Sequence, residues 1–327
     1  MSAGAAPGAT GEDPRPISLR GFRPYSVHLR ERRQLGPHFV RMVFGGADLD
    51  IFGTDGLDQR IKLVFPNDAG GWLDYGLDDP QAVAAGAWYQ RRLAAPSEQR
   101  NPIRTYTVRS VDPARRELCV DFAVHGASGP GTSFALRARP GDELIVIGPD
   151  ARSPEHRLGI DFQPGAARRV LLAGDETAAP AICSIVERLG AQSGPARVRV
   201  QAFVEVAEAG DALIGSPGEG IELNWPIRQG AHGAALIAAV SRFLRENPAF
   251  AAGAESAPAA PLEDVDVDEN LLWELPESGV TADFYAWIAG EAGVVRTLRR
   301  LLVAEHHVDR SVVAFMGYWR AGRSEAN

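Results

Sequence analysis

Arg104-Thr105-Tyr106-Thr107-Val108-Arg109 is the stretch that decides the fold of the N-terminal half. Its β-branched and aromatic residues are typical of a strand, whose two-residue period places Arg104, Tyr106 and Val108 on one face. Arginine pairs with a pyrophosphate, a tyrosine ring lies against a flat heterocycle, and a threonine hydroxyl bonds a ring nitrogen or a phosphate. Arg104, Tyr106 and Thr107 therefore suit a flavin dinucleotide, although an ordinary amphipathic strand with a solvated face fits the same pattern.

This stretch belongs to a series of short segments that are apolar or alternate in polarity over the length of a strand. Glycine and proline turns separate the segments, and no regular helical period lies between them. Six strands of this kind predict a small antiparallel β-barrel over residues 18–150. They cover residues 24–30, 38–44, 60–65, 104–109, 118–124 and 143–147. Residues 67–101 interrupt the series as a long loop with room for a short helix, and residues 1–17 are expected to form a disordered leader.

A glycine-rich segment follows residue 124, with the sequence His125-Gly-Ala-Ser-Gly-Pro-Gly-Thr-Ser-Phe134. Its three glycines and its proline predict a tight turn, after which Thr132 or Ser133 would cap a short helix. The free amides of such a helix N-terminus bind phosphate, although a plain turn with a capped helix explains the pattern equally well. His125 alone is more typical of a structural histidine than of a catalyst, because the sequence identifies no partner for it.

From residue 169 onward, strands alternate with helices. The alternation predicts a mostly parallel sheet with helix-covered faces over residues 169–324, in which ligands bind beyond the carboxyl ends of the strands. Strands are expected at residues 169–173, 197–204, near 221, 284–289 and 312–316, and helices at 179–189, 234–244 and 292–305. Residues 151–168 would be a linker, and residues 248–281, rich in alanine, proline and acids, a loop or linker inserted into the second domain.

Two segments follow strands of this second sheet, Gly174-Asp175-Glu176-Thr177 and Gly290-Glu291. Neither matches G-x-G-x-x-G, and two acidic side chains repel a phosphate at close range, so the dinucleotide motif is weak by itself. Glu205 ends the second strand, where an acid favours the ribose of NADH, but nearby arginines leave NADPH open.

Composition argues against several classes of protein. With 327 residues, 45% of them hydrophobic, the chain can form two domains with their own cores. The net charge of -8 argues against binding to nucleic acid. No apolar run has the length of a membrane span and no signal-peptide pattern is present, so a cytoplasmic protein without a membrane partner is expected. Cys119, Cys183 and seven histidines show no disulfide or metal-ligand spacing, so neither a metal site nor an acid–base catalyst is predicted.

Taken together and in order, five motifs resemble those of the siderophore-interacting protein family. The Arg-x-Tyr-Thr strand is followed by His-Gly-x-x-Gly-Pro, Ala-Gly-Asp-Glu-Thr-Ala-x-Pro-Ala-Ile, Trp-x-Ala-Gly-Glu and Gly-Tyr-Trp-Arg-x-Gly, and the match runs from about residue 20 to 324. These proteins are flavin-dependent ferric-siderophore reductases of the ferredoxin reductase-like superfamily. The resemblance implies a six-stranded antiparallel FAD-binding barrel followed by a parallel-sheet α/β domain that binds NAD(P)H.

The resemblance also assigns residues to ligands. The residues implied for FAD are Arg104, Tyr106, Thr107, His125, Gly126, Gly129, Pro130, Gly131 and Thr132. The residues implied near NADPH or NADH are Gly174, Asp175, Glu176, Thr177, Gly290 and Glu291. Phe134 stands where the family commonly has tryptophan. Lys62, the single lysine of the chain, and Arg320 match basic positions that attract an anionic ferric siderophore.

The implied reaction passes electrons from NAD(P)H through FAD to the ferric siderophore and releases Fe(II) in the cytoplasm. A flavin suits this reaction because it takes a hydride and gives up electrons singly, and oxygen ligands hold Fe(II) less tightly than Fe(III). Two alternatives remain, a related flavin reductase that serves another acceptor and a flavin- or siderophore-binding protein without turnover. Ferredoxin is an alternative donor, a monomer is expected, and no motif identifies the class of siderophore.

Overall fold

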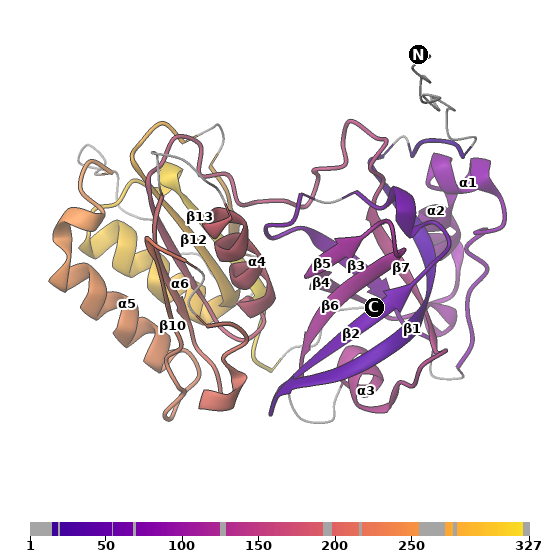
Figure 1. The fold of residues 1–327 in the computed structure, drawn as a ribbon, viewed down its shortest axis with the longest axis horizontal. Helices are drawn as coiled ribbons and strands as arrows, with labels where there is room; N and C mark the ends of the chain where they lie inside the picture. The colour runs from indigo at the N-terminus through magenta and orange to yellow at the C-terminus, as the bar shows by residue number, and fades with distance from the viewer. Residues whose placement is uncertain are drawn as a thin grey trace, which may run out of the picture.

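The computed structural model describes residues 15–18, 20–53, 55–67, 70–124, 129–191, 198–215, 218–254, 272–276 and 280–322. Its strands form two sheets that lie side by side, one from each half of the chain (Figure 1). The expected leader lies outside the described residues up to residue 14. Arg15, within the same segment, forms ion pairs with Asp48 and Asp50.

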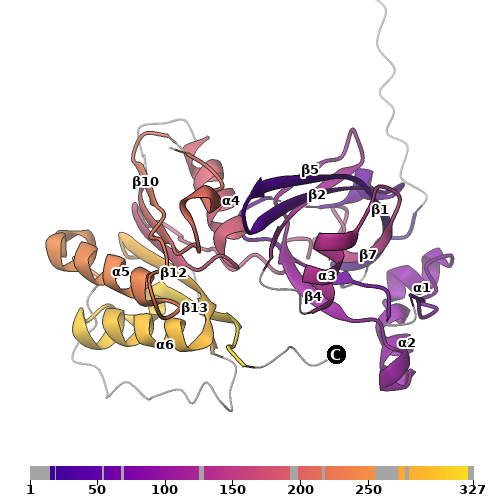
Figure 2. The ribbon, with the colours of Figure 1, turned by 90° about the horizontal axis from the view of Figure 1, so that it is seen from below.

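The N-terminal sheet is a strongly curled antiparallel sheet of seven described strands in the order β4-β3-β7-β1-β2-β6-β5 (Figures 1 and 2). The strands are β1 (Phe22–Gly36), β2 (Phe39–Gly45), β3 (Arg60–Val64), β4 (Ile103–Thr107), β5 (Ser110–Asp112), β6 (Glu117–Ala123) and β7 (Glu143–Pro149). The antiparallel sheet confirms the predicted class, but the prediction of six strands was wrong. The additional strand, β5, has three residues, which is too short to show an alternating pattern.

Side chains cover the inner face of this sheet and part of its outer face. Alternate residues, such as Val27 and Leu29 of β1 and Leu63 of β3, fill the inner core. Residues 70–101 cover part of the outer face, where Trp72 and Tyr75 pack near Ile147. They contain two α-helices, α1 (Pro80–Ala85) and α2 (Ala87–Ala94), where the sequence predicted a loop with room for one helix. A further helix, α3 (Pro130–Arg137), lies beside β6.

The C-terminal sheet has six described strands in the order β10-β9-β8-β12-β13-β11 and is parallel except at β11. The strands are β8 (Arg169–Gly174), β9 (Arg199–Val204), β10 (Ile221–Asn224), β11 (Trp273–Glu274), β12 (Phe284–Glu291) and β13 (Val313–Trp319). Helix α4 (Ala179–Gly190) covers one face, and α5 (Ala234–Glu246) and α6 (Ala292–Arg300) cover the other (Figures 1 and 2). The predicted covered parallel sheet is therefore confirmed. β11 falls inside the segment expected to be a loop or linker, whose residues 255–271 and 277–279 lie outside the described residues.

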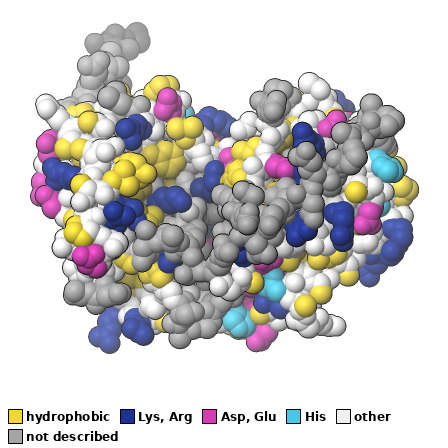
Figure 3. All heavy atoms as spheres, turned by 180° about the vertical axis from the view of Figure 1, so that it is seen from behind, with side chains coloured by type: hydrophobic (Ala, Val, Ile, Leu, Met, Phe, Trp, Pro, Cys, Tyr) yellow, Lys and Arg dark blue, Asp and Glu magenta, His cyan; other side chains and the backbone are white. Residues whose placement is uncertain are grey.

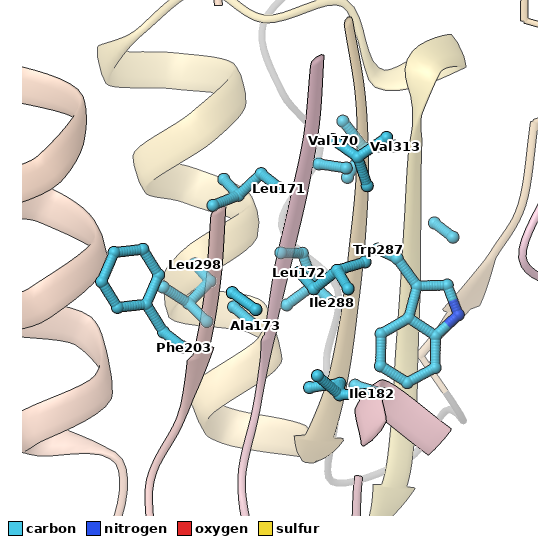
Figure 4. Close-up of a cluster of buried hydrophobic side chains, with 14 of the residues drawn as sticks. Val170, Leu171, Leu172, Ala173, Ile182, Phe203, Trp287, Ile288, Leu298 and Val313 are labelled. Atoms are coloured by element: carbon cyan, nitrogen blue, oxygen red, sulfur yellow. The ribbon is translucent and has the colours of Figure 1, made fainter. Parts of the chain in front are cut away.

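The central strands β8 and β12 are almost continuously apolar because helices cover them from both sides. Figure 4 shows Leu171, Leu172 and Ile288 among these buried side chains, with Trp287 on the same strand as Ile288. The remaining short helical turns are Leu49–Ile51, Ser97–Gln99, Ala209–Asp211, Pro248–Phe250 and Arg310–Val312, together with a π-helical turn at Leu301–Glu305. None of the helices in the described part of the chain has the length and apolar character needed to cross a lipid bilayer.

Candidate functional site

The predicted flavin strand is β4, which lies at one edge of the N-terminal sheet. It pairs with β3 so that Tyr106 lies opposite Ile61 and Arg104 opposite Leu63. Because Ile61 and Leu63 are buried in the inner core, Arg104 and Tyr106 share the inner face of the edge strand. The ring of Tyr106 packs against that of Phe122, with 4.4 Å between centroids. The two side chains singled out from the sequence therefore lie together on one face.

The glycine-rich segment brings helix α3 next to this strand. The helix begins at Pro130, after Gly129 with a φ of +94°, so the expected caps Thr132 and Ser133 lie inside its first turn and that prediction was wrong. A Cβ atom on Gly131 would clash with the hydroxyl of Tyr106, so glycine permits this close approach. His125 and Gly126 lie outside the described residues.

These residues fit a flavin dinucleotide. They combine a guanidinium on Arg104, an aromatic ring on Tyr106 and the N-terminus of a helix at Gly131, which are the donors and surfaces that a pyrophosphate and a planar ring require. No side chain within the described residues caps this helix terminus. Thr107, the last residue of the strand, is buried opposite Arg60.

The predicted nucleotide residues meet at the carboxyl ends of β8 and β12. Asp175 is buried, and its carboxylate accepts hydrogen bonds from the backbone N–H of Thr177 at 2.9 Å, the backbone N–H of Glu291 at 2.8 Å and the indole N–H of Trp319 at 2.9 Å. Burial, together with the nearby Glu176, raises the pKa of Asp175. Asp175 thus connects three segments that are far apart in sequence.

Glycines allow the segments at this edge to approach closely. A Cβ atom on Gly290, whose φ is +146°, would lie 2.7 Å from the Asp175 carboxylate. A Cβ atom on Gly174 would lie 2.7 Å from the carbonyl oxygen of Ala289. The glycines therefore let the Asp175 loop pack tightly against β12 at the carboxyl ends of the parallel strands, which is the edge where such sheets bind ligands.

Glu205 does not lie where a ribose could reach it. It is fully buried, and its carboxylate accepts hydrogen bonds from the N–H groups of Gly233 and Leu236 at 2.8 and 3.0 Å. It also accepts one from Arg228 at 2.9 Å, and Arg228 donates a second hydrogen bond to Glu176. Glu205 therefore stabilises the start of α5 and binds Arg228, so its carboxylate does not act as the acid that favours NADH.

Arg228 and His232 belong to this edge although sequence reasoning missed both. The imidazole of His232 lies 3.6 Å from Glu176 and 3.8 Å from Asp175, and its ring is T-shaped to Trp319 with 5.1 Å between centroids. The only sequence pattern near it is the Gly230-Ala-His-Gly233 turn before helix α5. The contacts of His232 with Glu176, Asp175 and Trp319 join residues more than 50 positions apart.

The two predicted substrate-binding residues lie on different sheets. Lys62 is exposed on β3, and its ammonium group donates to the hydroxyl of Thr105 at 2.5 Å. Arg320 directly follows β13, next to Ala321, whose N–H donates to Glu291 at 3.2 Å. Figure 3 shows Lys and Arg side chains over both halves of one face of the molecule. This face of the molecule therefore carries basic side chains, although the net charge of the chain is -8.

An ion pair joins the flavin strand to the C-terminal half. Arg109, two residues after β4, donates to both carboxylate oxygens of Glu187 on α4, at 2.7 and 2.5 Å. Arg109 also lies 3.5 Å from Asp121, which is fully buried and accepts two hydrogen bonds from Arg41. The segment that carries Tyr106 is thus tied to the helix that follows Asp175.

A second contact between the halves surrounds Asp58. This carboxylate is fully buried and accepts hydrogen bonds from the indole N–H of Trp287 at 3.0 Å and from the N–H groups of Phe162 and Asp161 at 3.1 and 3.2 Å. Burial raises the pKa of Asp58 to about 6. Arg60 lies over the ring of Trp273, with 4.4 Å between the guanidinium carbon and the centroid.

The chain matches two family models and several known proteins. The models are a siderophore-interacting FAD-binding domain over residues 28–153 and a siderophore-interacting protein over residues 167–322. An uncharacterized protein of Mycobacterium tuberculosis is 35% identical over 90% of this chain and 89% of its own length. The ferric vibriobactin reductase ViuB of Vibrio cholerae is 27% identical over 92% and 91% of the two chains. An NADPH-dependent ferric-chelate reductase of Escherichia coli is 28% identical over 92% and 93%.

Solved structures show the same arrangement. The siderophore-interacting protein SipS from Aeromonas hydrophila has a TM-score of 0.62 and 25% identity, covering 93% of this chain and 94% of its own. A ferredoxin reductase in carbazole 1,9a-dioxygenase has a TM-score of 0.55 at 12% identity and covers 91% of this chain and 70% of its own, which shows the fold alone. The fold is therefore of the ferredoxin reductase-like type.

Proposed function

Because the chain belongs to the siderophore-interacting protein family, we propose that it is an FAD-dependent ferric-siderophore reductase with NADPH or NADH as electron donor. One observation carries the proposal. The strand with Arg104 and Tyr106 is tied by the Arg109–Glu187 ion pair to the helix that follows the Asp175 edge. A flavin site on one sheet and a nucleotide site on the other would thereby be held within reach of each other, as hydride transfer requires.

In this proposal, the N-terminal sheet is the FAD domain and the C-terminal sheet is the nucleotide domain. Arg104 and the start of α3 would bind the pyrophosphate, and Tyr106 would orient the ring system. When bound, FAD supplies the conversion of a two-electron hydride into single electrons. The nicotinamide would bind at the carboxyl ends of β8 and β12, where Gly174 and Gly290 let the Asp175 loop pack against β12. The protein's own contribution is binding, orientation and exclusion of water.

The substrate would be an anionic ferric chelate. Lys62 and Arg320 would raise its local concentration in a chain that is otherwise acidic. Reduction weakens the hold of oxygen ligands on iron, because Fe(II) is a softer and less highly charged ion, so iron is released in the cytoplasm.

An anaerobic experiment tests this function. The FAD-loaded protein is mixed with NADPH or NADH, and the flavin absorbance is followed before and after a ferric siderophore and a ferrous-specific dye are added. Bleaching by a nucleotide, recovery on addition of the chelate and a rising dye signal are the expected results. Bleaching without recovery would identify a reductase for another acceptor. Bound flavin that neither nucleotide bleaches would indicate either a binding protein or ferredoxin as the donor, and addition of reduced ferredoxin separates these two.

Substitution of Lys62 by alanine should lower kcat/KM for the ferric chelate about threefold to tenfold at low salt, because loss of one ammonium group near the surface weakens the attraction of an anion. This change corresponds to about 0.7–1.4 kcal/mol. Bleaching of the flavin by the nucleotide should not change. Stopped-flow absorbance separates the two steps. Lys62→Arg should retain most of the rate, and Arg115→Ala, an exposed charge at the β5–β6 turn, is the matched control. Equal chelate rates in Lys62→Ala and the parent protein would remove Lys62 from the substrate site.

A further inference from the structure

His232 is a partly buried histidine whose two ring nitrogens have no hydrogen-bond partner among the described residues. Its Nε2 atom nevertheless lies 3.6 Å from a carboxylate oxygen of Glu176 and 3.8 Å from one of Asp175. The ring thus lies near two carboxylates and packs against the indole of Trp319. In its protonated form, it can compensate the negative charge of these carboxylates.

When the imidazole of His232 is neutral, the carboxylates around it outnumber the positively charged groups. The charged groups that face His232 are Asp175 and Glu176 from the loop between β8 and α4, and Arg228 from the segment after β10. From β13, Trp319 contributes an uncharged indole. Arg228 is shared between Glu176 and the buried Glu205, so one guanidinium serves two carboxylates while Asp175 has neutral donors only.

The local environment favours the protonated ring. Burial lowers the pKa of His232 and so does Arg228, but Glu176 and Asp175 raise it more, and the net shift is upward. The imidazolium form therefore persists above the ordinary range for histidine.

We propose that His232 is a positioning residue that makes nucleotide binding depend on pH. As an imidazolium, it compensates Asp175 and Glu176 and fixes Trp319 beside them. As a neutral ring, it leaves an anionic nucleotide facing Asp175, which has neutral donors only, and Glu176, which shares Arg228 with Glu205. This inference rests on the proposed function, since it takes the carboxyl-end edge of the C-terminal sheet as the nucleotide site.

The test measures nucleotide affinity rather than turnover. NAD⁺ is titrated into the FAD-loaded protein by calorimetry between pH 6.0 and 8.5, and the titration is repeated with NADP⁺. The affinity of the parent protein should fall about tenfold as the pH rises. The free energy behind a tenfold change is smaller than the Coulomb energy of two charges about 4 Å apart near a protein surface. His232→Gln should change less than twofold over the range and should bind at pH 6.0 as weakly as the parent does at pH 8.5. A dependence seen with both nucleotides cannot come from the 2′-phosphate, which itself titrates near pH 6.

Two further variants serve as a control for the His232→Gln titration and as an independent test of the charge effect. His28→Gln, an exposed histidine on β1, should keep the parent profile. Glu176→Gln, which removes one of the two carboxylates, should bind more tightly than the parent at pH 8.5, and this variant decides the question if His232→Gln does not fold. A tenfold pH dependence retained in folded His232→Gln would overturn the inference and leave the proposed function standing. Absence of nucleotide binding to the parent protein at every pH would overturn both.

Discussion

Replacing Arg104 with alanine should weaken FAD binding about a hundredfold. Arg104 shares the inner face of the edge strand with Tyr106, whose hydroxyl closely approaches Gly131 in the first turn of α3. Hydrogen bonds between arginine and a charged group contribute about 1.5–3 kcal/mol, and a loss of about 2.7 kcal/mol corresponds to a hundredfold change in Kd. Calorimetric titration of FAD into flavin-free protein measures the change directly.

Two companion variants identify the cause of that loss. Arg104→Lys keeps the charge but loses the planar fork, so its affinity should fall only about tenfold. Arg115→Ala removes an exposed arginine from the same sheet and should bind FAD normally. Thermal melting without flavin should be similar for all three variants. Wild-type affinity in Arg104→Ala would mean that the pyrophosphate lies elsewhere and that the assignment of the whole strand is wrong.

Hydrophobic patterns in the sequence identified the strands that bury one whole face in a core. They did not identify strands that are very short or largely exposed. The segments around Leu63 and Ile288 carry clear apolar patterns because they fill the two cores. β5 and β11 have three and two residues, too few to show any period. The second half of β1, residues 31–36, is mostly polar and exposed or half-buried, so its pairing with β2 depends on the backbone and leaves no hydrophobic signature.

The site was predictable where its residues share one element or follow neighbouring strands of the parallel sheet. Arg104 and Tyr106 are two positions apart on a strand, so the period alone places them on one face. Asp175 was expected to repel a phosphate, whereas its carboxylate accepts hydrogen bonds from two backbone amides, the Thr177 hydroxyl and an indole. Arg228 follows β10, and His232 precedes α5, so both reach this edge only because β10 pairs with β9 and α5 packs on the sheet. Periodicity along the chain does not encode such long-range contacts.

Asp58 makes the stability of the protein depend on pH in the direction opposite to that of a salt-bridged carboxylate. Burial, reinforced by Asp161, raises its pKa from 3.8 in the unfolded chain to about 6 in the folded protein. Its stabilising contribution is therefore fully present below pH 3.8 and is lost as the pH rises to about 6. The loss amounts to about 3 kcal/mol, since one pKa unit corresponds to about 1.4 kcal/mol.

Asp58→Asn should therefore be less stable than the parent protein at pH 4, and the difference should shrink or reverse by pH 7. The amide cannot accept all three hydrogen bonds that come from Trp287, Phe162 and Asp161, which costs about 1–3 kcal/mol at any pH. The variant escapes the cost of ionising a buried carboxylate, so the gap should narrow by about 3 kcal/mol between pH 4 and pH 7. Urea unfolding at saturating FAD, followed at several pH values, measures this gap. Asp78→Asn, at an exposed position, should parallel the parent protein. A gap that is constant with pH would mean that the three donors fully compensate the charge of Asp58, and that this contact between the two halves does not respond to pH.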